Sequence, residues 1–155
     1  VKFAVGRWAR GAKTKPPSEA EARAARHDFF TREMKRRRAN LLWLAHQQDD
    51  IAETMLMRLA RGSGMGGLAA PRPVQEFAAG RVHLRPLLTV AKAELVAALR
   101  AAGATWREDA SNASPRYFRN RIRGVVLPAW ADAAGRDAVA GAALSRERLE
   151  EDEVA

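Results

Sequence analysis

An abrupt change from apolar to acidic residues in the middle of the chain constrains the fold more than any other feature. Leu41 to Ala45 form a short continuous apolar run, and His46-Gln47-Gln48-Asp49-Asp50-Ile51-Ala52-Glu53-Thr54 follow it directly. Such a run is typical of a strand buried on both faces, and Asp49 or Asp50 can cap a helix that begins there. The pattern predicts a buried strand that passes directly into a helix, as in α/β proteins.

Local signals predict two more helices. Ser18-Glu19-Ala20-Glu21 matches a capping box, in which the two outer side chains accept from each other's backbone N–H groups. The helix that begins there is expected to extend to Arg37, with an apolar stripe formed by Ala22, Ala25, Phe29, Phe30 and Met34. Another amphipathic helix is expected from Lys92 to Ala102, where Gly103 stops it.

The remaining segments give weaker signals. Val1 to Val5 alternate in polarity and are expected to form a short strand, and Gly11 to Pro17 a loop. Residues 71–90 are predicted to be loop and short strand. A helix over Tyr117 to Val126 should stop before the next proline, and the C-terminal residues are expected to be helical but to end in a charged run with little to pack against.

Gly62-Ser63-Gly64-Met65-Gly66-Gly67 has the spacing G-x-G-x-x-G. A dinucleotide-binding loop with this spacing needs a strand before it and a helix after it. Here the motif follows a helix whose buried side is predicted to be Met55, Leu56 and Leu59, so a glycine-rich turn at a helix end is the better interpretation.

The charge of the chain is uneven. Its 155 residues carry 27 Lys and Arg against 18 Asp and Glu, a net charge of +9, and residues 1–40 hold 12 of the basic residues and only 4 acidic ones. A second basic cluster covers Arg116 to Arg123. Two basic zones favour a polyanionic partner such as nucleic acid, with a solvated helix face as the alternative.

Composition also excludes several classes of protein. Without cysteine the chain cannot be a disulfide scaffold, a thiolate zinc protein or an enzyme with a cysteine nucleophile. No apolar run approaches the ~20 residues of a membrane helix, so no membrane partner is expected. A cytoplasmic protein, or a piece of one, is the default expectation.

The acidic cluster could carry chemistry. Asp50 and Glu53, three positions apart, project from one face of the predicted helix and could hold an ammonium group or, with His46, a divalent metal. The alternative is structural: Asp49 caps the helix, Glu53 stabilises its first turn and His46 is a loop residue.

The arginine cluster could bind phosphate. On a helix, Arg119 and Arg123 share a face while Arg121 points elsewhere, and the planar guanidinium suits phosphate geometry. Pairing of these arginines with carboxylates such as Asp109 is the alternative.

The order of these pieces resembles one family. Ala45 to Thr54, followed by Leu59-Ala60-Arg61-Gly62-Ser63-Gly64 and Gly67-Leu68, resembles the HHxDDQxET…LxRGSGxxGL block of tRNA(Ile)-lysidine synthetases, which are PP-loop ATP pyrophosphatases. Three further blocks follow in family order: Arg85-Pro86-Leu87-Leu88, Trp106 to Asn112, and Tyr117 to Arg123 with Leu127-Pro128. Upstream, Ala22 to Phe30 resembles the family's AR..RY.FF helix, so the likeness covers about residues 18–130.

The resemblance implies a fold and a function. The fold is an α/β, partial adenine-nucleotide alpha-hydrolase-like (PP-loop) domain that is helix-rich and retains few parallel strands. Residues 1–130 would be the C-terminal part of the catalytic domain, and residues 131–155 the start of a following helical segment. The family enzyme is an ATP-dependent ligase that adenylates C2 of the wobble cytidine of tRNA(Ile) with a CAU anticodon, after which L-lysine displaces AMP.

The resemblance also implies roles for individual residues. The catalytic positions would be His46, Asp50 and Glu53. The positions that face ATP or other phosphates would be Arg26, Arg119 and Arg123. The tRNA-binding positions would be Lys35, Arg36, Arg37, Arg38 and Arg121. ATP with Mg²⁺ is the expected cofactor, no protein-held metal is expected, and a homodimer is compatible with the family.

The sequence departs from the family pattern at several points. Gln47 replaces the second His of the block, Ile51 replaces a Gln, and His27 replaces a Tyr. The SGGxDS loop that binds ATP is missing, so we expect a fragment that is inactive alone. Two other functions stay open: a non-catalytic RNA-binding module, and a metal-dependent hydrolase centred on His46, Asp50 and Glu53.

Overall fold

The computed structural model describes residues 2–8, 17–109, 112 and 114–154. The chain divides into two compact units, Val1–Leu42 with Glu76–His83, and Trp43–Gln75 with Leu84–Ala155. The predicted loop Gly11 to Pro17 lies outside the described residues except for its last proline.

The first unit contains the long helix α1, Glu19–Arg37, with the predicted bounds. Its capping box is confirmed: the Ser18 backbone N–H donates to a Glu21 carboxylate oxygen at 2.8 Å, and the Glu21 N–H donates to Ser18 Oγ at 3.2 Å. The predicted apolar stripe is partly buried, and its last member, Met34, is only 6% exposed.

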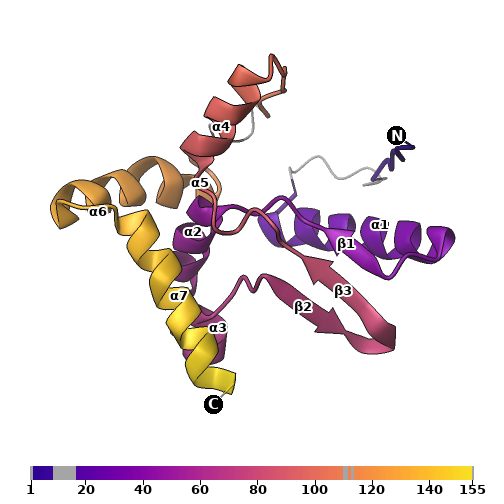
Figure 1. Cartoon of the computed structure of the whole chain (residues 1–155), viewed down its shortest axis with the longest axis horizontal. Helices are drawn as coiled ribbons and strands as arrows, with labels where there is room; N and C mark the ends of the chain where they lie inside the picture. The colour runs from indigo at the N-terminus through magenta and orange to yellow at the C-terminus, as the bar shows by residue number, and fades with distance from the viewer. Residues whose placement is uncertain (1, 9–16, 110–111, 113, 155) are drawn as a thin grey trace. The chain divides into compact units, whose positions relative to one another are not determined.

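A three-stranded sheet has the order β1-β3-β2. Its strands are β1 Leu41–Trp43, β2 Val74–Phe77 and β3 Arg81–Leu84. Val82 N–H donates to Asn40 O and Leu44 N–H to Leu84 O, so β1 and β3 run parallel. The short 3-10 turn η1, Ala78–Gly80, joins β2 to β3 as an antiparallel hairpin (Figure 1). The mixed sheet with one parallel pair confirms the predicted α/β class with few parallel strands.

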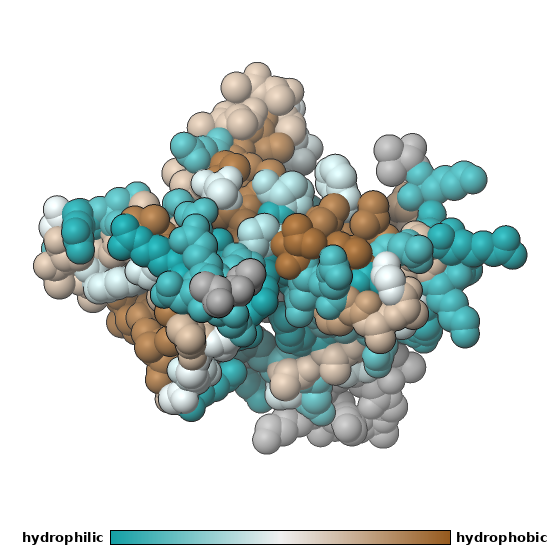
Figure 2. Space-filling view, turned by 60° about the horizontal axis from the view of Figure 1, so that its bottom comes forward, coloured by the Kyte–Doolittle hydropathy of each residue, from teal (hydrophilic) through white to brown (hydrophobic). Residues whose placement is uncertain are grey.

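Two strand predictions are wrong in detail. The apolar run forms an edge strand and is not buried on both faces, because Leu41 is 57% and Trp43 70% exposed. Apolar residues are visible at the molecular surface as brown patches in Figure 2. Residues 2–8 form no strand; Phe3 and Val5 are exposed, and alternation alone cannot make a strand without a paired neighbour.

The second unit consists mainly of helices and the segments that connect them, and it contains only the ends of the three strands. Its helices are α2 Gln48–Leu59, α3 Met65–Leu68, α4 Lys92–Ala101, α5 Phe118–Arg121, α6 Leu127–Ala134 and α7 Ala138–Val154. Its core contains Ala52, Met55, Met57, Ile122, Leu127 and Ala142. The helix predicted at Lys92 is confirmed, and α3 adds a short helical turn inside the glycine-rich segment. Leu59, predicted to be buried, is 54% exposed.

The C-terminal helix α7 packs along α2 and α3 (Figure 1). Ala138, Ala142 and Arg146 are buried, and their spacing of four residues places them on one face. The expectation that this segment has little to pack against is therefore wrong. Among the described residues, no helix has the length and apolar character that crossing a membrane requires.

The helical segment after Tyr117 continues past Pro128, where the sequence predicted a stop. A π-helical turn, η3 Ile122–Val126, links α5 to α6, and the Leu127 N–H donates to the Ile122 carbonyl five residues earlier. Pro128 then lies in the first turn of α6, where a missing backbone N–H costs little.

Candidate functional site

Two segments far apart in the sequence bring four charged side chains together in the second unit. Asp50 and Glu53 lie in the first turns of α2, while Arg119 lies on α5 and Arg123 on the adjoining π turn. We call these four residues the acid–arginine cluster. The sequence predicted both halves of this cluster but not that they contact each other.

Glu53 is the centre of the cluster. It is 0% exposed, and its Oε1 accepts from Arg123 Nε at 2.5 Å while Oε2 accepts from Arg123 Nη2 at 3.0 Å. Arg119 Nε forms an ion pair with the same Oε2 at 2.9 Å. A buried carboxylate needs such partners, and the two-point contact with Arg123 is the strongest geometry for it. Both Glu53 oxygens are therefore committed to guanidinium groups.

Asp50 is the more accessible acid, with a side chain 17% exposed. One oxygen accepts from the Gln47 backbone N–H at 3.0 Å, so Asp50 helps to cap α2. The other lies 4.0 Å from Arg119 Nη2, which itself donates to Thr54 Oγ1 at 3.0 Å. Asp50 thus combines a structural hydrogen bond with an oxygen that faces the cluster.

Asp49 does not cap its own helix. Its carboxylate accepts from the Lys92 backbone N–H at 2.8 Å and so holds the start of α4 against α2. This contact satisfies one of the N–H groups left free at a helix start.

A cavity of about 280 Å³ opens beside the cluster. Glu53, Arg123 and Asp49 contribute polar groups to its wall, and Leu127, Pro128 and Val139 contribute apolar ones. The hydrogen bonds to Glu53 raise the pKa of Arg123 above its ordinary value, against partial burial, which lowers it. The Arg123 charge is therefore fixed at any physiological pH.

His46 lies in the segment before α2 and is half-buried. Within the described part of the chain, no group of three His, Asp or Glu side chains is arranged to hold a metal ion. The metal-dependent hydrolase hypothesis therefore lacks a ligand set in these residues.

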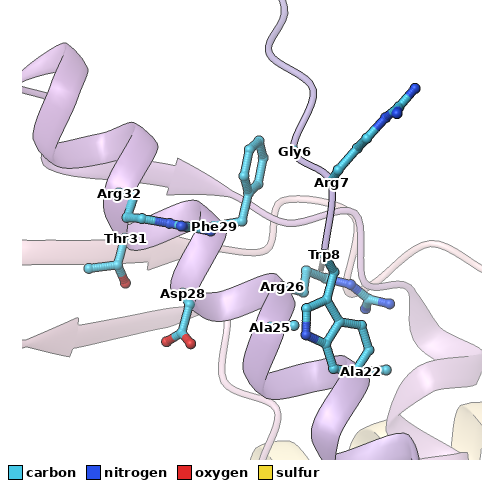
Figure 3. A pocket seen from close by; sticks show the side chains of 10 residues that line it. All are labelled: Gly6, Arg7, Trp8, Ala22, Ala25, Arg26, Asp28, Phe29, Thr31 and Arg32. Atoms are coloured by element: carbon cyan, nitrogen blue, oxygen red, sulfur yellow. The ribbon is translucent and has the colours of Figure 1, made fainter. Parts of the chain in front are cut away.

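The predicted phosphate-binding Arg26 lies in the first unit, on α1. It lines a cavity of about 800 Å³ together with Arg7, Trp8, Phe29 and Arg32 (Figure 3). Residues 6–8 run close to α1, because a Cβ on Gly6 would lie 2.6 Å from the Phe29 ring. The sequence analysis did not single out Arg7 or Trp8, which lie between the predicted strand Val1 to Val5 and the predicted loop Gly11 to Pro17.

The tRNA-binding candidates of α1 lie at its C-terminal end. Arg36 Nη2 and Arg37 Nε pair with Glu33 at 2.6 and 3.2 Å, while Lys35 and Arg38 are exposed. The hydrogen bond from Arg36 lowers the pKa of Glu33. These residues present positive charge at a helix C-terminus, which the helix dipole stabilises.

Arg121, the remaining candidate, lies in the second unit. Its Nη1 donates to the carbonyls of Pro115 and Arg116 at 2.9 and 3.1 Å, and its guanidinium lies 5.6 Å from the Phe118 ring centre. Arg121 thus holds the preceding loop.

Thr54, which accepts from Arg119, is the contact of the acid–arginine cluster that the sequence analysis did not single out, although it directly follows Glu53.

Comparison with known proteins identifies the family. A family model described as a PP-loop domain matches residues 1–130, most of the chain. The chain belongs to the PP-loop domain family.

Curated relatives of this PP-loop chain carry one name. It is 46% identical over 110 residues to a tRNA(Ile)-lysidine synthase of Bacillus subtilis, covering 71% of this chain and 23% of that protein. A tRNA(Ile)-lysidine synthase of Xanthomonas campestris pv. campestris is 46% identical over 127 residues, covering 77% of the chain and 28% of the relative. One from Bradyrhizobium sp. is 41% identical over 128 residues, covering 83% and 35%. The chain therefore spans about a quarter to a third of the length of the curated relatives it matches.

Proposed function

We propose that this chain forms the part of a tRNA(Ile)-lysidine synthase that positions lysine and faces the reacting phosphate. The observation that carries the proposal is the acid–arginine cluster: the buried Glu53 contacts Arg119 and Arg123, and Asp50 lies 4.0 Å from Arg119. Glu53 and Arg123 also line the neighbouring cavity. The similarity to tRNA(Ile)-lysidine synthases over most of the chain supports the same reaction.

The proposed reaction has two steps. In the first, the oxygen on C2 of the wobble cytidine bonds to the α-phosphorus of ATP and pyrophosphate leaves. In the second, an amine of L-lysine attacks C2, the bond from C2 to the adenylate oxygen breaks, and AMP leaves. Arg119 and Arg123 would offset negative charge on the phosphate in both steps, because fixed guanidinium groups stabilise charge without reorganising.

We assign different tasks to the two acids. Glu53 is a positioning residue, because each of its two carboxylate oxygens contacts an arginine and neither oxygen is left to bind a lysine ammonium. Asp50 is the candidate to bind the lysine amine and to accept its proton as the bond to C2 forms, since it keeps an oxygen facing the cluster. His46, two residues before the start of α2, is a further candidate for proton transfer.

The described residues would contribute to the binding of ATP with Mg²⁺ through its phosphates. Mg²⁺ is commonly held by one or two carboxylates together with substrate phosphates. The proposed contribution of the described residues is to the phosphates, through Arg119 and Arg123 in the second unit and, separately, through Arg26 in the first. When bound, the metal would neutralise phosphate charge.

The basic end of α1 is the proposed contact for tRNA. Lys35, Arg36, Arg37 and Arg38 form a run of four positive charges, and such a run binds phosphates with an affinity that falls as salt rises. A module that only binds RNA would share this property, so lysine incorporation, which such a module would not support, is the property that separates the two functions.

A chimera tests the proposal. The matched 110 residues of the Bacillus subtilis relative would be replaced by those of this chain, and incorporation of labelled lysine into a tRNA(Ile) transcript would be measured. We expect lysine incorporation that depends on ATP. A chimera that unfolds cooperatively like its parent and binds the transcript, yet incorporates no lysine, would contradict the proposal and favour the RNA-binding module.

A further inference from the structure

The large cavity of the first unit combines aromatic and cationic side chains that belong to no part of the proposed lysine site. It has a volume of about 800 Å³ and lies between the N-terminal segment and α1 (Figure 3). Trp8 and Phe29 are its aromatic residues, and Arg7, Arg26 and Arg32 are its cations. Trp8 and the three arginines are exposed, so a ligand in the cavity can reach all four of them.

Two of these arginines carry charge that no acid of the described residues neutralises. Within those residues neither Arg7 nor Arg32 forms an ion pair, whereas the arginines of the acid–arginine cluster are bound to Glu53. Asp28 is the one acid among the described lining residues and stands against three arginines. The wall therefore keeps an excess of positive charge, which attracts phosphate groups.

The two guanidinium groups lie on different sides of the cavity. In Figure 3, Phe29 separates Arg32 on one side from Arg7 and Trp8 on the other, and Arg7 extends away from α1. Cations that are separated in this way suit the successive phosphates of an extended strand better than they suit one phosphate. A positively charged groove that follows a phosphate backbone is typical of proteins that bind single-stranded nucleic acid.

Trp8 offers a flat aromatic surface beside these charges. It is 46% exposed although it is the largest apolar side chain of the segment. The backbone directly before it is held against α1, because a Cβ on Gly6 would lie 2.6 Å from the Phe29 ring. Unpaired bases stack on exposed aromatic rings, whereas the bases of a double helix are already stacked on one another.

We propose that this cavity binds an unpaired nucleotide of a single-stranded RNA segment. The base would stack on Trp8, and the phosphates on either side of it would contact Arg7 and Arg32. Arg26, the third cation of the wall, already has a proposed phosphate partner, so the inference rests on the other two. The proposal concerns the first unit alone and does not rest on the lysine chemistry proposed for the second.

Fluorescence anisotropy of the full chain with a labelled oligouridylate tests the stacking. Trp8→Ala should weaken binding by about five- to a hundredfold, the range measured when one stacked base loses its aromatic partner. Trp8→Phe keeps an aromatic ring and should retain most of the affinity. Trp106→Ala is the matched control: it removes a tryptophan that is 42% exposed in the second unit, and it should bind like the unchanged chain.

The phosphate contacts are tested on the same strand. Arg7→Gln and Arg32→Gln should each weaken binding and reduce the slope of log affinity against log salt by about 0.7, the value for one phosphate of a single strand. Arg148→Gln, at an exposed position on α7, should change neither quantity. Asp28→Asn removes the acid of the wall and should tighten binding, a gain that an unfolded variant could not show.

Three results would overturn the proposal. The first is equal affinity of Trp8→Ala and the unchanged chain for the oligouridylate. The second is equal affinity of the unchanged chain for the oligouridylate and for a ribose-phosphate strand of the same length without bases, which would mean that no base is stacked. The third is a loss of ATP binding in Trp8→Ala, measured by calorimetric titration, as large as its loss of strand binding. This third result would assign the ring to the adenine of a free nucleotide.

Discussion

At the scale of single residues, Glu53 determines how the acid–arginine cluster is built. It is fully buried, it binds Arg123 at two points, and it contacts Arg119. From the sequence alone, Glu53 is expected to be an accessible acid in the first turn of a helix that could bind a ligand. The residue type was predictable, but its partners, which lie 66 and 70 positions further along the chain, were not.

Glu53→Ala should lower the free energy of unfolding by about 3 kcal/mol, because it leaves two guanidinium groups without their buried counter-charge. Urea unfolding followed by circular dichroism measures this. Glu33→Ala is the control: Glu33 also pairs with two arginines, but at the surface, where screening by water should leave a clearly smaller loss. Equal losses in the two variants would show that the buried network contributes nothing special.

At the scale of elements, the best sequence predictions depended on short-range signals. The bounds of α1 followed from its capping box, and α4 from its apolar spacing and the glycine that follows it. The wrong predictions depended on distant partners. Residues 2–8 lack a paired strand, β1 lies at a sheet edge, and α7 packs on α2, none of which is encoded in the local pattern.

Ser18→Ala should destabilise α1 by about 1 kcal/mol, because the Glu21 N–H loses its side-chain acceptor. Ser18→Asp keeps an acceptor at the same position and should retain most of that stability. Hydrogen exchange at the first turn of α1 measures the effect locally. Equal exchange rates in Ser18→Ala and Ser18→Asp would contradict the role of the cap.

At the scale of the whole molecule, the charge distribution follows the two units. The basic end of α1 belongs to the first unit, and the acid–arginine cluster to the second. The positive excess of residues 1–40 was evident from the sequence, and Lys35 and Arg38 keep it exposed. Only the structure distinguishes these exposed charges from Arg119 and Arg123, whose charges are bound to acids.

The double variant Lys35→Ala with Arg38→Ala should weaken tRNA binding and reduce the slope of log affinity against log salt by about two, one for each lost phosphate contact. Filter binding over a KCl series gives the slope. Arg148→Ala removes an exposed charge on α7 and should leave the slope unchanged. An unchanged slope in the double variant would exclude this end of α1 as a phosphate contact.

Lysine incorporation by the chimera carrying Asp50→Asn tests the central claim most directly. Asn keeps the size of Asp and a side-chain acceptor for the Gln47 N–H, but it cannot bind an ammonium by charge or accept its proton. We predict a loss of incorporation of about a hundredfold or more, in the range that general-base catalysis contributes, with tRNA binding retained. Asp132→Asn, an exposed acid on α6, should incorporate lysine at the unchanged rate. Incorporation by Asp50→Asn at the rate of Asp132→Asn would contradict the assignment of this cluster as the lysine site.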